Sequence, residues 1–600
     1  MVKRGRNFQF RLILLALVVS FIVASSAAVS QSQGSYKSDP AYVRARQVFT
    51  RARSLPNFSQ LQSNDNRFNA LYANLANVLS AIDSGRSDMV KRGGLTEFAT
   101  DNLNAYSDAL LREYLEPGKP VTSAPSSAAP ANVSSSGPAR WVGPAPQPTP
   151  QIDLTSYGGP PPSAPIKTVS ARSGEDLGLL INAANAELVL TRKGSIAVTG
   201  GGILRTQAVV DVSITFDGGT YDCQTQTPWG GCILLGDGVT AKGTWTTPQF
   251  APTDTAEQRL QKAKAVRGTT FIEPTYKLNP YTPAVTIFQA RRDTTNSSHT
   301  DSPQKVSVIG FHFVGAQTIY DGGVRSTIQF GNCHDCLESN NFYDTTASIG
   351  MEFGGDPAKG NYSKHCLSYR SVFYRVPAAN LAAINSEDTL FIEPTILAPS
   401  RNAPWGGGVS GVDLEPNTPL DRMTGVGIYN AYISFEGSER YGAGNGIAIQ
   451  NPYRLVNGKI ANVTVANTII RGGLFSDFTR TLSNGIFVNG PTPGLKVVNV
   501  FIRATGQSCI SLAGGGEGYL IQDVRCESTG SAGSANAIEL HGVKGAQFIH
   551  NYIYDAAGTT FSTASIFREC DDSRNNVFKD NVVTSALAKQ MGAVVSTPCR

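Results

Sequence analysis

Two carboxylates stand two residues apart in residues 411–415, which read GVDLE. In an extended strand, successive side chains point to opposite faces. Val412 and Leu414 would therefore point to one face, and Asp413 and Glu415 to the other. The pattern predicts a strand that buries an apolar face and displays a pair of acids.

A pair of acids at this spacing can perform two kinds of chemistry. Alternate residues of a strand lie about 6.5 Å apart, and glycosidases separate their carboxyl groups by about 5–5.5 Å for retention or 6.5–9.5 Å for inversion. One of Asp413 and Glu415 would then be the protonated acid and the other the base or nucleophile, with their pKa values separated by mutual repulsion. Carboxylates also suit Ca²⁺, so both residues are candidate calcium ligands as well.

The strand that carries the acids is one copy of a repeat. Similar short strands are predicted at 350–354, 381–385, 446–450, 485–489, 509–513 and 537–541. The copies recur roughly every 24 to 39 residues, with further β-rich runs between them. Alternating strands with Gly and Asn at their corners, one turn per repeat, predict a β-solenoid.

Stacking the copies in register predicts two columns of outward side chains about 4.8 Å apart from coil to coil. The first column contains Glu352, Ala383, Asp413, Ala448, Phe487, Ser511 and Glu539, and the second contains Gly354, Asn385, Glu415, Gln450, Asn489, Ala513 and His541. The acid pair would then lie between Asn385 and Gln450, with Glu352 two coils away. Glu539 and His541 would form a second subsite or ordinary surface.

Aromatic residues near the acid pair are typical of a sugar-binding groove. Arg422, seven residues after Glu415, is a further candidate catalytic residue. The alternative is an ordinary solvated strand face, which also carries polar residues. The candidate substrate-binding residues are Trp405, Asn385, Gln450, Asn489 and Tyr441.

Residues 166–600 resemble the right-handed parallel β-helix of the pectin-lyase-like superfamily. The resemblance rests on the repeated strands and on Asn467, Asn551 and Asn581, which we place at matching offsets in their coils, like the asparagine ladder of that fold. It implies a mainly β protein. The superfamily contains lyases, hydrolases, epimerases, esterases and non-catalytic adhesins, so the fold does not determine the activity.

Two classes of function follow from these features. The first is an exported enzyme that binds and cleaves a polysaccharide along its parallel sheet, as a hydrolase or as a lyase. In the lyase, Glu352, Asp413 and Glu415 would hold Ca²⁺ against a uronate, and Arg422 or Arg471 would abstract the proton. The sequence lacks a clear counterpart of the polygalacturonase aspartate triad or the pectate lyase arginine motif. The second class is a non-catalytic surface or adhesion module.

The first 28 residues predict export. Basic residues up to Arg11 precede an apolar run over 12–24 and then small residues, which is the layout of a secretory signal. The alternative is an uncleaved membrane anchor over 12–29, which approaches the ~18 residues that span a bilayer. Either reading predicts a secreted, periplasmic or cell-surface protein. The net charge of +5, with no basic stripe, argues against a nucleic-acid partner.

Three segments follow the export signal. Apolar stripes at helical spacing predict a small α-helical region over 39–117, interrupted at Gly93-Gly94. Residues 118–165 are rich in Pro, Ala and Ser and predict a disordered or extended linker. The solenoid would occupy 166–600.

The start of the solenoid carries a predicted cap. Residues 173–176 precede apolar residues at helical spacing, which predicts a short helix covering the first coil and its open sheet edges. A strand is predicted at 188–191. Residues 246–303 predict an insertion with a helix around 256–266, and such insertions often gather on a binding face.

Nine cysteines in an exported chain predict disulfides, with at least one cysteine unpaired. Cys223 and Cys232 are close enough in sequence to close a loop. The C-x-x-C at 333–336 predicts a local disulfide or buried cysteines, since no second such pair accompanies it. The others expected as free interior thiols are Cys509, Cys526 and Cys570.

Overall fold

The computed structural model of the chain contains two compact units, Met1–Pro138 and Ala139–Arg600. The structure describes residues 35–64 except 57, separate positions between 72 and 115, and 148–598 with gaps at 192–193, 226–230, 274–285, 291–302, 316–325, 347–348, 356–361, 400–409, 417, 419, 437–443, 452–459, 473–482, 528–536, 556–566 and 586–595.

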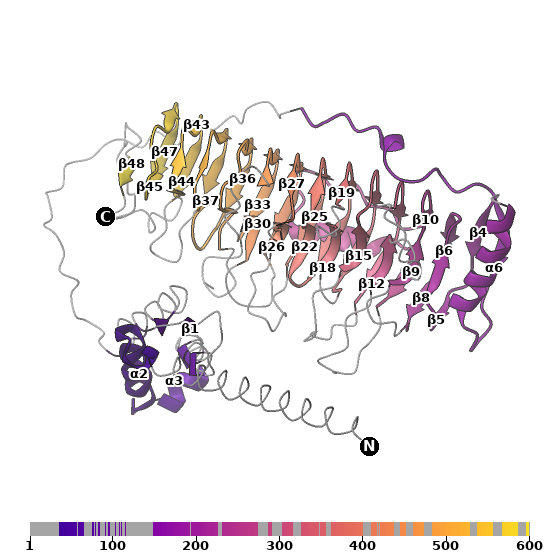
Figure 1. The fold of residues 1–600 in the computed structure, drawn as a ribbon, viewed down its shortest axis with the longest axis horizontal. Helices are drawn as coiled ribbons and strands as arrows, with labels where there is room; N and C mark the ends of the chain where they lie inside the picture. Colours follow the sequence, from indigo (N-terminus) through magenta and orange to yellow (C-terminus); the bar gives the residue numbers. More distant parts are fainter. Residues whose placement is uncertain are drawn as a thin grey trace, which may run out of the picture. The chain divides into compact units, whose positions relative to one another are not determined.

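The second unit is a right-handed parallel β-helix, so the predicted mainly β fold is confirmed. Each full coil gives one strand to each of three long parallel sheets, and the coils stack side by side in Figure 1. Sheet 1 has 14 strands, from β3 (Pro165–Val169) to β46 (Val577–Lys579), and sheet 2 has 13, from β5 (Gly202–Leu204) to β47 (Val582–Ser585). Sheet 3 consists of β6 (Ala208–Val210), β9 (Gly231–Leu235), β12 (Thr286–Ala290), β15 (Ser326–Gly331), β18 (Ile349–Gly354), β22 (Ala379–Ala383), β26 (Ser410–Leu414), β30 (Asn445–Gln450), β34 (Ile486–Asn489), β37 (Ile510–Ala513), β41 (Ile538–His541), β45 (Phe567–Cys570) and β48 (Ser596–Pro598).

Stacking buries an apolar inner face that a single coil could not bury alone. In sheet 3, Val412 pairs with Leu381 on one side and with Ile447 on the other, and all three are fully buried. Such burial stabilises the fold by roughly 25 cal/mol per Å² of apolar surface. The same core continues from Val169 to Phe567.

Several sheet 3 strands have a glycine near their start, because the backbone of the next coil lies too close for a side chain. A Cβ atom on Gly411 would stand 2.5 Å from the carbonyl oxygen of Gly446, and one on Gly446 would stand 2.5 Å from that of Gly485. This close approach explains the glycine at the start of the repeat.

Asparagines connect the coils at the corner between sheets 1 and 2. The Asn551 side chain donates to the Ile521 carbonyl at 3.0 Å and to the Asn581 side chain at 2.9 Å, so these two asparagines stack as predicted. Asn467 lies one position earlier in its coil, has a left-handed backbone (φ 52°) and accepts from Asn499 at 2.8 Å. The prediction that all three share one offset is therefore wrong. Two adjacent columns form, because asparagine tolerates the left-handed corner.

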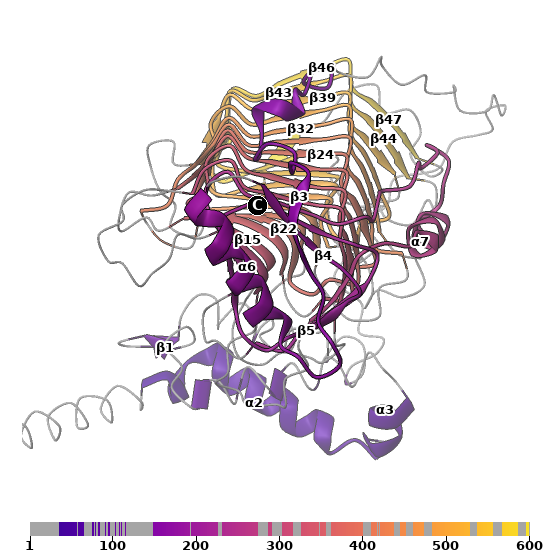
Figure 2. The same cartoon turned by 90° about the vertical axis from the view of Figure 1, so that its right-hand side faces the viewer.

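Helix α6 (Leu177–Thr191) covers the first coil, as predicted, and lies across the near end of the solenoid in Figure 2. Its buried residues recur at helical spacing as far as Leu188. The predicted strand at 188–191 is therefore wrong: packing of Leu188 against the first coil continues the helix.

Helix α7 (Ala256–Ala265) confirms the helix predicted within 246–303, and it starts with a capping box between Thr255 and Gln258. It packs on the outer face of sheet 2, where the Arg259 guanidinium lies 4.0 Å from the ring centroid of Tyr432. The rest of 246–303 is not all insertion, because it includes β12 and the sheet 2 strand β11 (Thr270–Ile272).

Part of the predicted linker packs on the solenoid. We call residues 148–163 the strap. Within the strap, Tyr157 is buried against sheet 1 and its ring stacks on His365 at 4.4 Å. The Gly159 backbone donates to Ser307, and the Pro160 carbonyl accepts from Thr240. Of the two predicted states, disordered or extended, the first is wrong over this range, because the strap buries apolar side chains against sheet 1; residues 118–147 lie outside the described residues.

The first unit contains η1 (Ser35–Ser38), α2 (Pro40–Arg53), α3 (Phe58–Asn64) and the antiparallel pair β1 (Val90–Lys91) and β2 (Gly94–Leu95). Asp39 caps the N-terminus of helix α2, its side chain accepting from the Ala41 backbone, and the helix packs in a small apolar cluster. No helix among the described positions is long and apolar enough to cross a membrane. The predicted export signal lies outside the described residues.

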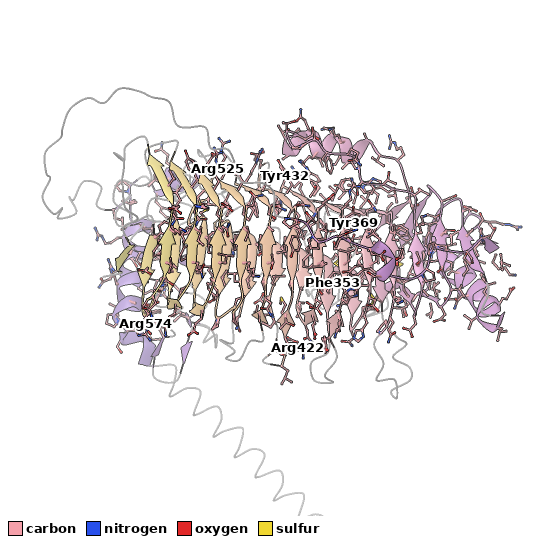
Figure 3. The ribbon with its side chains drawn as sticks, turned by 90° about the horizontal axis from the view of Figure 1, so that it is seen from above. Phe353, Tyr369, Arg422, Tyr432, Arg525 and Arg574 are labelled. Carbon is pink, nitrogen blue, oxygen red and sulfur yellow. A yellow bond between two sulfur atoms is a disulfide. The ribbon has the colours of Figure 1, made fainter. Side chains whose placement is uncertain are left out.

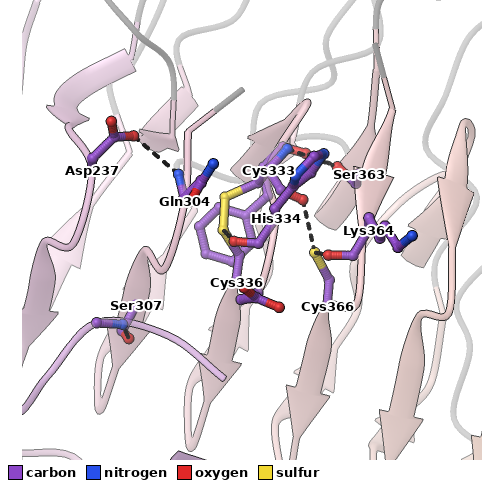
Figure 4. Close-up of a disulfide and its surroundings, with 12 residues drawn as sticks. Asp237, Gln304, Ser307, Cys333, His334, Cys336, Ser363, Lys364 and Cys366 are labelled. Atoms are coloured by element: carbon purple, nitrogen blue, oxygen red, sulfur yellow. Dashed lines mark hydrogen bonds between the residues drawn. A yellow bond between two sulfur atoms is a disulfide. The ribbon is translucent and has the colours of Figure 1, made fainter. Parts of the chain in front are cut away.

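Three disulfides join pairs of described cysteines in the solenoid: Cys223–Cys232, Cys333–Cys336 and Cys509–Cys526. Figure 4 shows the second, beside the buried free thiol of Cys366, which donates to the Cys333 carbonyl at 3.1 Å. Cys570 is also disulfide-bonded. The expectation of free thiols at 509, 526 and 570 is wrong; Cys509 and Cys526 point into one coil interior from different sides and meet there.

Candidate functional site

The acid pair lies on sheet 3 with the predicted alternation of side chains. Val412 and Leu414 are fully buried, whereas Asp413 in β26 and Glu415 just after it are half-buried on the outer face. Backbone pairing with β22 and β30 fixes their position from both sides. The strand therefore presents two acids without disturbing the core.

One amide contacts both acids. The Nε2 atom of Gln450, at the end of β30, donates to Asp413 Oδ1 at 3.1 Å and to Glu415 Oε2 at 3.4 Å. The two carboxyl groups thus lie within two hydrogen-bond lengths of each other. Gln450, predicted as a neighbour of the pair, is the residue that connects them.

The surroundings of the pair favour its protonated form. Burial raises the pKa of Asp413 to about 6, although the hydrogen bond from Gln450 lowers it. Burial also raises the pKa of Glu415 to about 7, and the nearby charge of Asp413 adds to this rise. Near neutral pH the pair can therefore hold a proton and a negative charge side by side, as acid–base catalysis requires.

The first outward column differs from the prediction by one residue in β22. Ala382, rather than Ala383, pairs with both Glu352 and Asp413. Ala383 faces the apolar core instead, since a slip of one residue moves every side chain of a strand to the other face; Ala382, on the outer face, is buried as well. The structure aligns apolar Leu381 with its apolar neighbours, and this sets the register.

Asn385 does not flank Glu415 as predicted. It is buried, and its side-chain oxygen accepts from the Arg422 backbone N–H at 3.0 Å. Asn385 holds the turn that follows its sheet 3 strand. Because its side chain is buried there, it does not contact a substrate directly. Asn489, by contrast, pairs with Gln450 in the second column and is half-buried there. Trp405 and Tyr441 lie outside the described residues.

Glu352 turns away from the acid pair. Its carboxylate accepts from Ser326 at 2.6 Å and from Gln329 at 3.5 Å, both on β15. Asp413 lies two strands away in the other direction, which is roughly 9.5 Å along the sheet. Calcium ligands approach the ion to 2.3–2.6 Å, so Glu352, Asp413 and Glu415 do not fit one shared Ca²⁺ site in this arrangement.

Arg422 contacts Glu387 rather than the acid pair. Its guanidinium donates to the Glu387 carboxylate and lies 4.6 Å from the ring centroid of Tyr362. These residues border a small sheet of β19 (Ser363–Lys364), β23 (Ser386–Glu387), β27 (Met423–Thr424) and β31 (Ile460–Ala461). Figure 3 shows Arg422 along one edge of the solenoid and Tyr432 along the opposite edge.

Arg471 is excluded as a base for the acid pair by its position. It ends β33 (Ile469–Arg471) in sheet 2, with its guanidinium 5.6 Å from the ring centroid of Tyr432. The acid pair belongs to sheet 3, so Arg471 cannot act on the same bond. The lyase hypothesis loses this candidate for its proton-abstracting residue.

Sequence reasoning missed the polar residues before Glu352. Gln289 on β12 donates to Gln329 on β15 at 2.9 Å, and Gln329 in turn donates to Glu352. Both glutamines pair in register with Glu352 along sheet 3. The signal was present in the sequence, since each occupies the outward position of a short apolar strand, but β12 lies within the range predicted as an insertion.

A second polar cluster ends the column. His541 lies 3.4 Å from Glu539 and 3.1 Å from Asp571. The hydrogen bond with Glu539 raises the pKa of His541 against the opposing effect of burial, and Asp571 adds to the rise. Within the described part of the chain, Cys570 completes a group with metal-ligand spacing, but its sulfur is already in a disulfide. The cluster is therefore an ion-pair network.

Comparison with known proteins identifies similar folds. No protein-family model matches the sequence, and no curated protein matches it. The A-module of the mannuronan C-5 epimerase AlgE6 of Azotobacter vinelandii matches with a TM-score of 0.41 and 11% identity, over 72% of this chain and 93% of that module.

Phage proteins match at a similar level. Tailspike protein 3 of bacteriophage CBA120 matches with a TM-score of 0.39 and 9% identity, over 73% of this chain and 62% of the tailspike. A variant tailspike protein of E. coli bacteriophage HK620 matches with a TM-score of 0.44 and 11% identity, over 69% of this chain and 64% of the tailspike. At these identities the likeness concerns the fold alone.

Proposed function

We propose that this protein is a glycoside hydrolase that binds a polysaccharide along the outer face of sheet 3 and cleaves it at Asp413 and Glu415. One observation carries the proposal: a single amide contacts two half-buried carboxyl groups whose pKa values are raised to about 6 and about 7. Paired carboxyl groups held close together in different protonation states are the machinery of glycoside hydrolysis.

The two acids take different roles. Glu415 has the higher pKa and retains its proton longer as pH rises, so it is the general acid that protonates the glycosidic oxygen. Asp413 is the carboxylate that either attacks the anomeric carbon or activates a water. The configuration of the released sugar distinguishes these two routes.

The position of the acids favours cleavage within a long chain. Six outward positions of sheet 3, from β6 to β22, precede Asp413, and four follow it before β45. At about 4.8 Å per strand, the column extends roughly 29 Å before Asp413 and roughly 19 Å after it, which is the length of several sugar residues. The expected products are oligosaccharides.

Export remains part of the proposal. The disulfides of the solenoid support it, because disulfides persist in oxidising compartments outside the cytoplasm. The predicted signal at residues 1–28 would provide the route.

Incubation of the full chain with a panel of polysaccharides tests the function. For the parent we expect new reducing ends without the ultraviolet absorbance of unsaturated uronates. In Asp413→Asn and Glu415→Gln we expect no reducing ends to form. The matched control is Glu393→Gln, which changes an exposed acid paired with Arg370 away from sheet 3. Absorbance together with reducing ends would indicate elimination, and binding without products would indicate an adhesion module.

A further inference from the structure

The outer face of sheet 3 offers more partly exposed side chains directly after the acid pair than directly before it. In the first column, the two residues before the pair, Glu352 and Ala382, are buried. Two strands after the pair, Phe487 is half-buried in the same column, and Gln450 and Asn489 are half-buried in the second column. A polymer lying beside the acids would therefore meet accessible side chains mainly on this side.

Phe487 stands in line with Asp413 on this outer face. Asp413 pairs with Ala448, which pairs with Phe487, so Phe487 lies two strands beyond the acid, roughly 9.5 Å along the sheet. Its neighbours in β34, Ile486 and Val488, are fully buried, and the alternation of a strand therefore directs the ring outward. Ala448 is small and buried, so no bulky side chain separates the acid from the ring.

Packing within the solenoid does not account for this ring. On the outer face of sheet 2, by comparison, Phe342 is fully buried in a cluster with Trp245 and helix α7. Phe487 belongs to none of the apolar clusters formed by the described residues, and part of its surface stays exposed. Aromatic side chains that combine an open apolar face with nearby polar groups are typical of ligand-binding surfaces.

Polar groups suited to sugar hydroxyls lie beside the ring. Asn489 follows Phe487 by two residues in β34 and pairs with Gln450, whose amide reaches both acids. Each of these amides offers donors and an acceptor. A pyranose ring presents C–H groups on its faces and hydroxyl groups around its edge. Its face can therefore pack on the aromatic ring while its edge forms hydrogen bonds with the amides.

We propose that Phe487 is a substrate-positioning residue whose ring stacks on a sugar of the bound polysaccharide, at a subsite two strands beyond the acid pair, with Asn489 binding the hydroxyl groups of that sugar. This inference rests on the proposed function and requires a substrate long enough to span Asp413 and Phe487. Stacking removes apolar surface of both the ring and the sugar from water. The stacked sugar is remote from the cleaved bond, so it contributes binding that positions the chain rather than chemistry.

Substrates of increasing length test the subsite in the full chain. The probes are β-glucan, galactan, mannan, xylan, polygalacturonan and alginate, followed by a series of oligosaccharides from each polymer that the parent cleaves. For oligosaccharides long enough to reach Phe487, Phe487→Ala should raise KM at least about 10-fold. It should leave kcat unchanged, because the ring binds the substrate and the transition state equally. Both proteins should cleave shorter oligosaccharides with the same KM.

Two further variants separate stacking from apolar bulk. Phe487→Tyr keeps the flat ring and should retain the KM of the parent, whereas Phe487→Leu keeps an apolar side chain without a ring and should behave like Phe487→Ala. The matched control is Phe501→Ala, which removes a half-buried phenylalanine from β36 (Phe501–Arg503) on the outer face of sheet 2 and should leave KM unchanged. Melting temperatures establish that each variant is folded.

Binding without turnover separates the two proposals. Affinity electrophoresis through gels that contain the same polymers compares Glu415→Gln with and without Phe487→Ala. If the parent releases no reducing ends but binding weakens with Phe487→Ala, hydrolysis is overturned and the subsite stands. If the parent cleaves a polymer and Phe487→Ala or Phe487→Leu keeps the same KM at every length, the subsite is overturned and hydrolysis stands. If no polymer is bound or cleaved, both proposals fail.

Discussion

Gln450 Nε2 donates to Asp413 Oδ1 at 3.1 Å across the gap between two adjacent strands of sheet 3. The same nitrogen reaches Glu415, so one neutral side chain holds both acids in place. Because the amide stabilises the ionised form of Asp413, it increases the difference in pKa between the two carboxyl groups. Gln450 is therefore a positioning residue for the proposed acid–base pair.

The rate of hydrolysis should depend on pH as a bell-shaped curve. Below about 6 Asp413 gains a proton, and above about 7 Glu415 loses one, so the active form is most populated between these values. Measurement of kcat/KM across the acid and alkaline ranges checks this. A rate that stays constant into the alkaline range would exclude Glu415 as the general acid.

Replacement of Gln450 should shift the acid limb of the pH–rate profile. In Gln450→Leu the pKa of Asp413 should rise, because its hydrogen bond is lost, and the acid limb should shift to higher pH. The matched control is Gln522→Leu, which removes a glutamine that donates to Asp523 at 2.9 Å on sheet 1. A uniform loss of rate without a shift of the acid limb would show that Gln450 acts otherwise.

Stability should also depend on the acid pair. The folded pKa values of about 6 and about 7 exceed the ordinary values of 3.8 and 4.5. The protonated pair therefore favours the folded state fully below about pH 4, and this contribution is lost as pH rises through the folded pKa values. At alkaline pH each ionised carboxyl group should thus lower the free energy of unfolding by roughly 1–2 kcal/mol, after allowance for its partial exposure.

The double variant Asp413→Asn, Glu415→Gln measures this cost. Its melting temperature should exceed that of the parent at alkaline pH, and the difference should shrink as pH falls toward 4. Parallel curves for the two proteins would contradict the raised pKa values. The charge control Glu393→Gln should show no such convergence, because Glu393 pairs with Arg370 at the surface.

Local patterns in the sequence predict the repeat, the helix α6 and the outward direction of Asp413 and Glu415, because each depends on neighbouring residues. The register of β22 could not be predicted by aligning small residues, since Ala382 and Ala383 are chemically alike and only the packing of Leu381 separates them. Asn385 illustrates the same point: its partner, the Arg422 backbone, lies 37 residues away.

Contacts between segments that are distant in the sequence could not be predicted from it either. Cys509 and Cys526 are 17 residues apart, and only the coil geometry brings their sulfur atoms together. The strap reads as linker because its composition is typical of one. In the structure the side chain of Tyr157 packs against three strands of sheet 1, so the strap is bound to the solenoid.

The strap itself provides the last prediction. Tyr157 is 7% exposed and packs on Leu337, Leu367 and Ile392, so Tyr157→Ala should lower the free energy of unfolding by about 2–4 kcal/mol. Leu154→Ala is the matched control, because Leu154 is 40% exposed in the same strap and should change stability by less than about 0.5 kcal/mol. Thermal unfolding gives the magnitude, and limited proteolysis gives the location: cleavage within residues 148–163 should accelerate in Tyr157→Ala alone. Equal proteolysis of this segment in the parent and both variants would show that Tyr157 does not hold the strap on sheet 1.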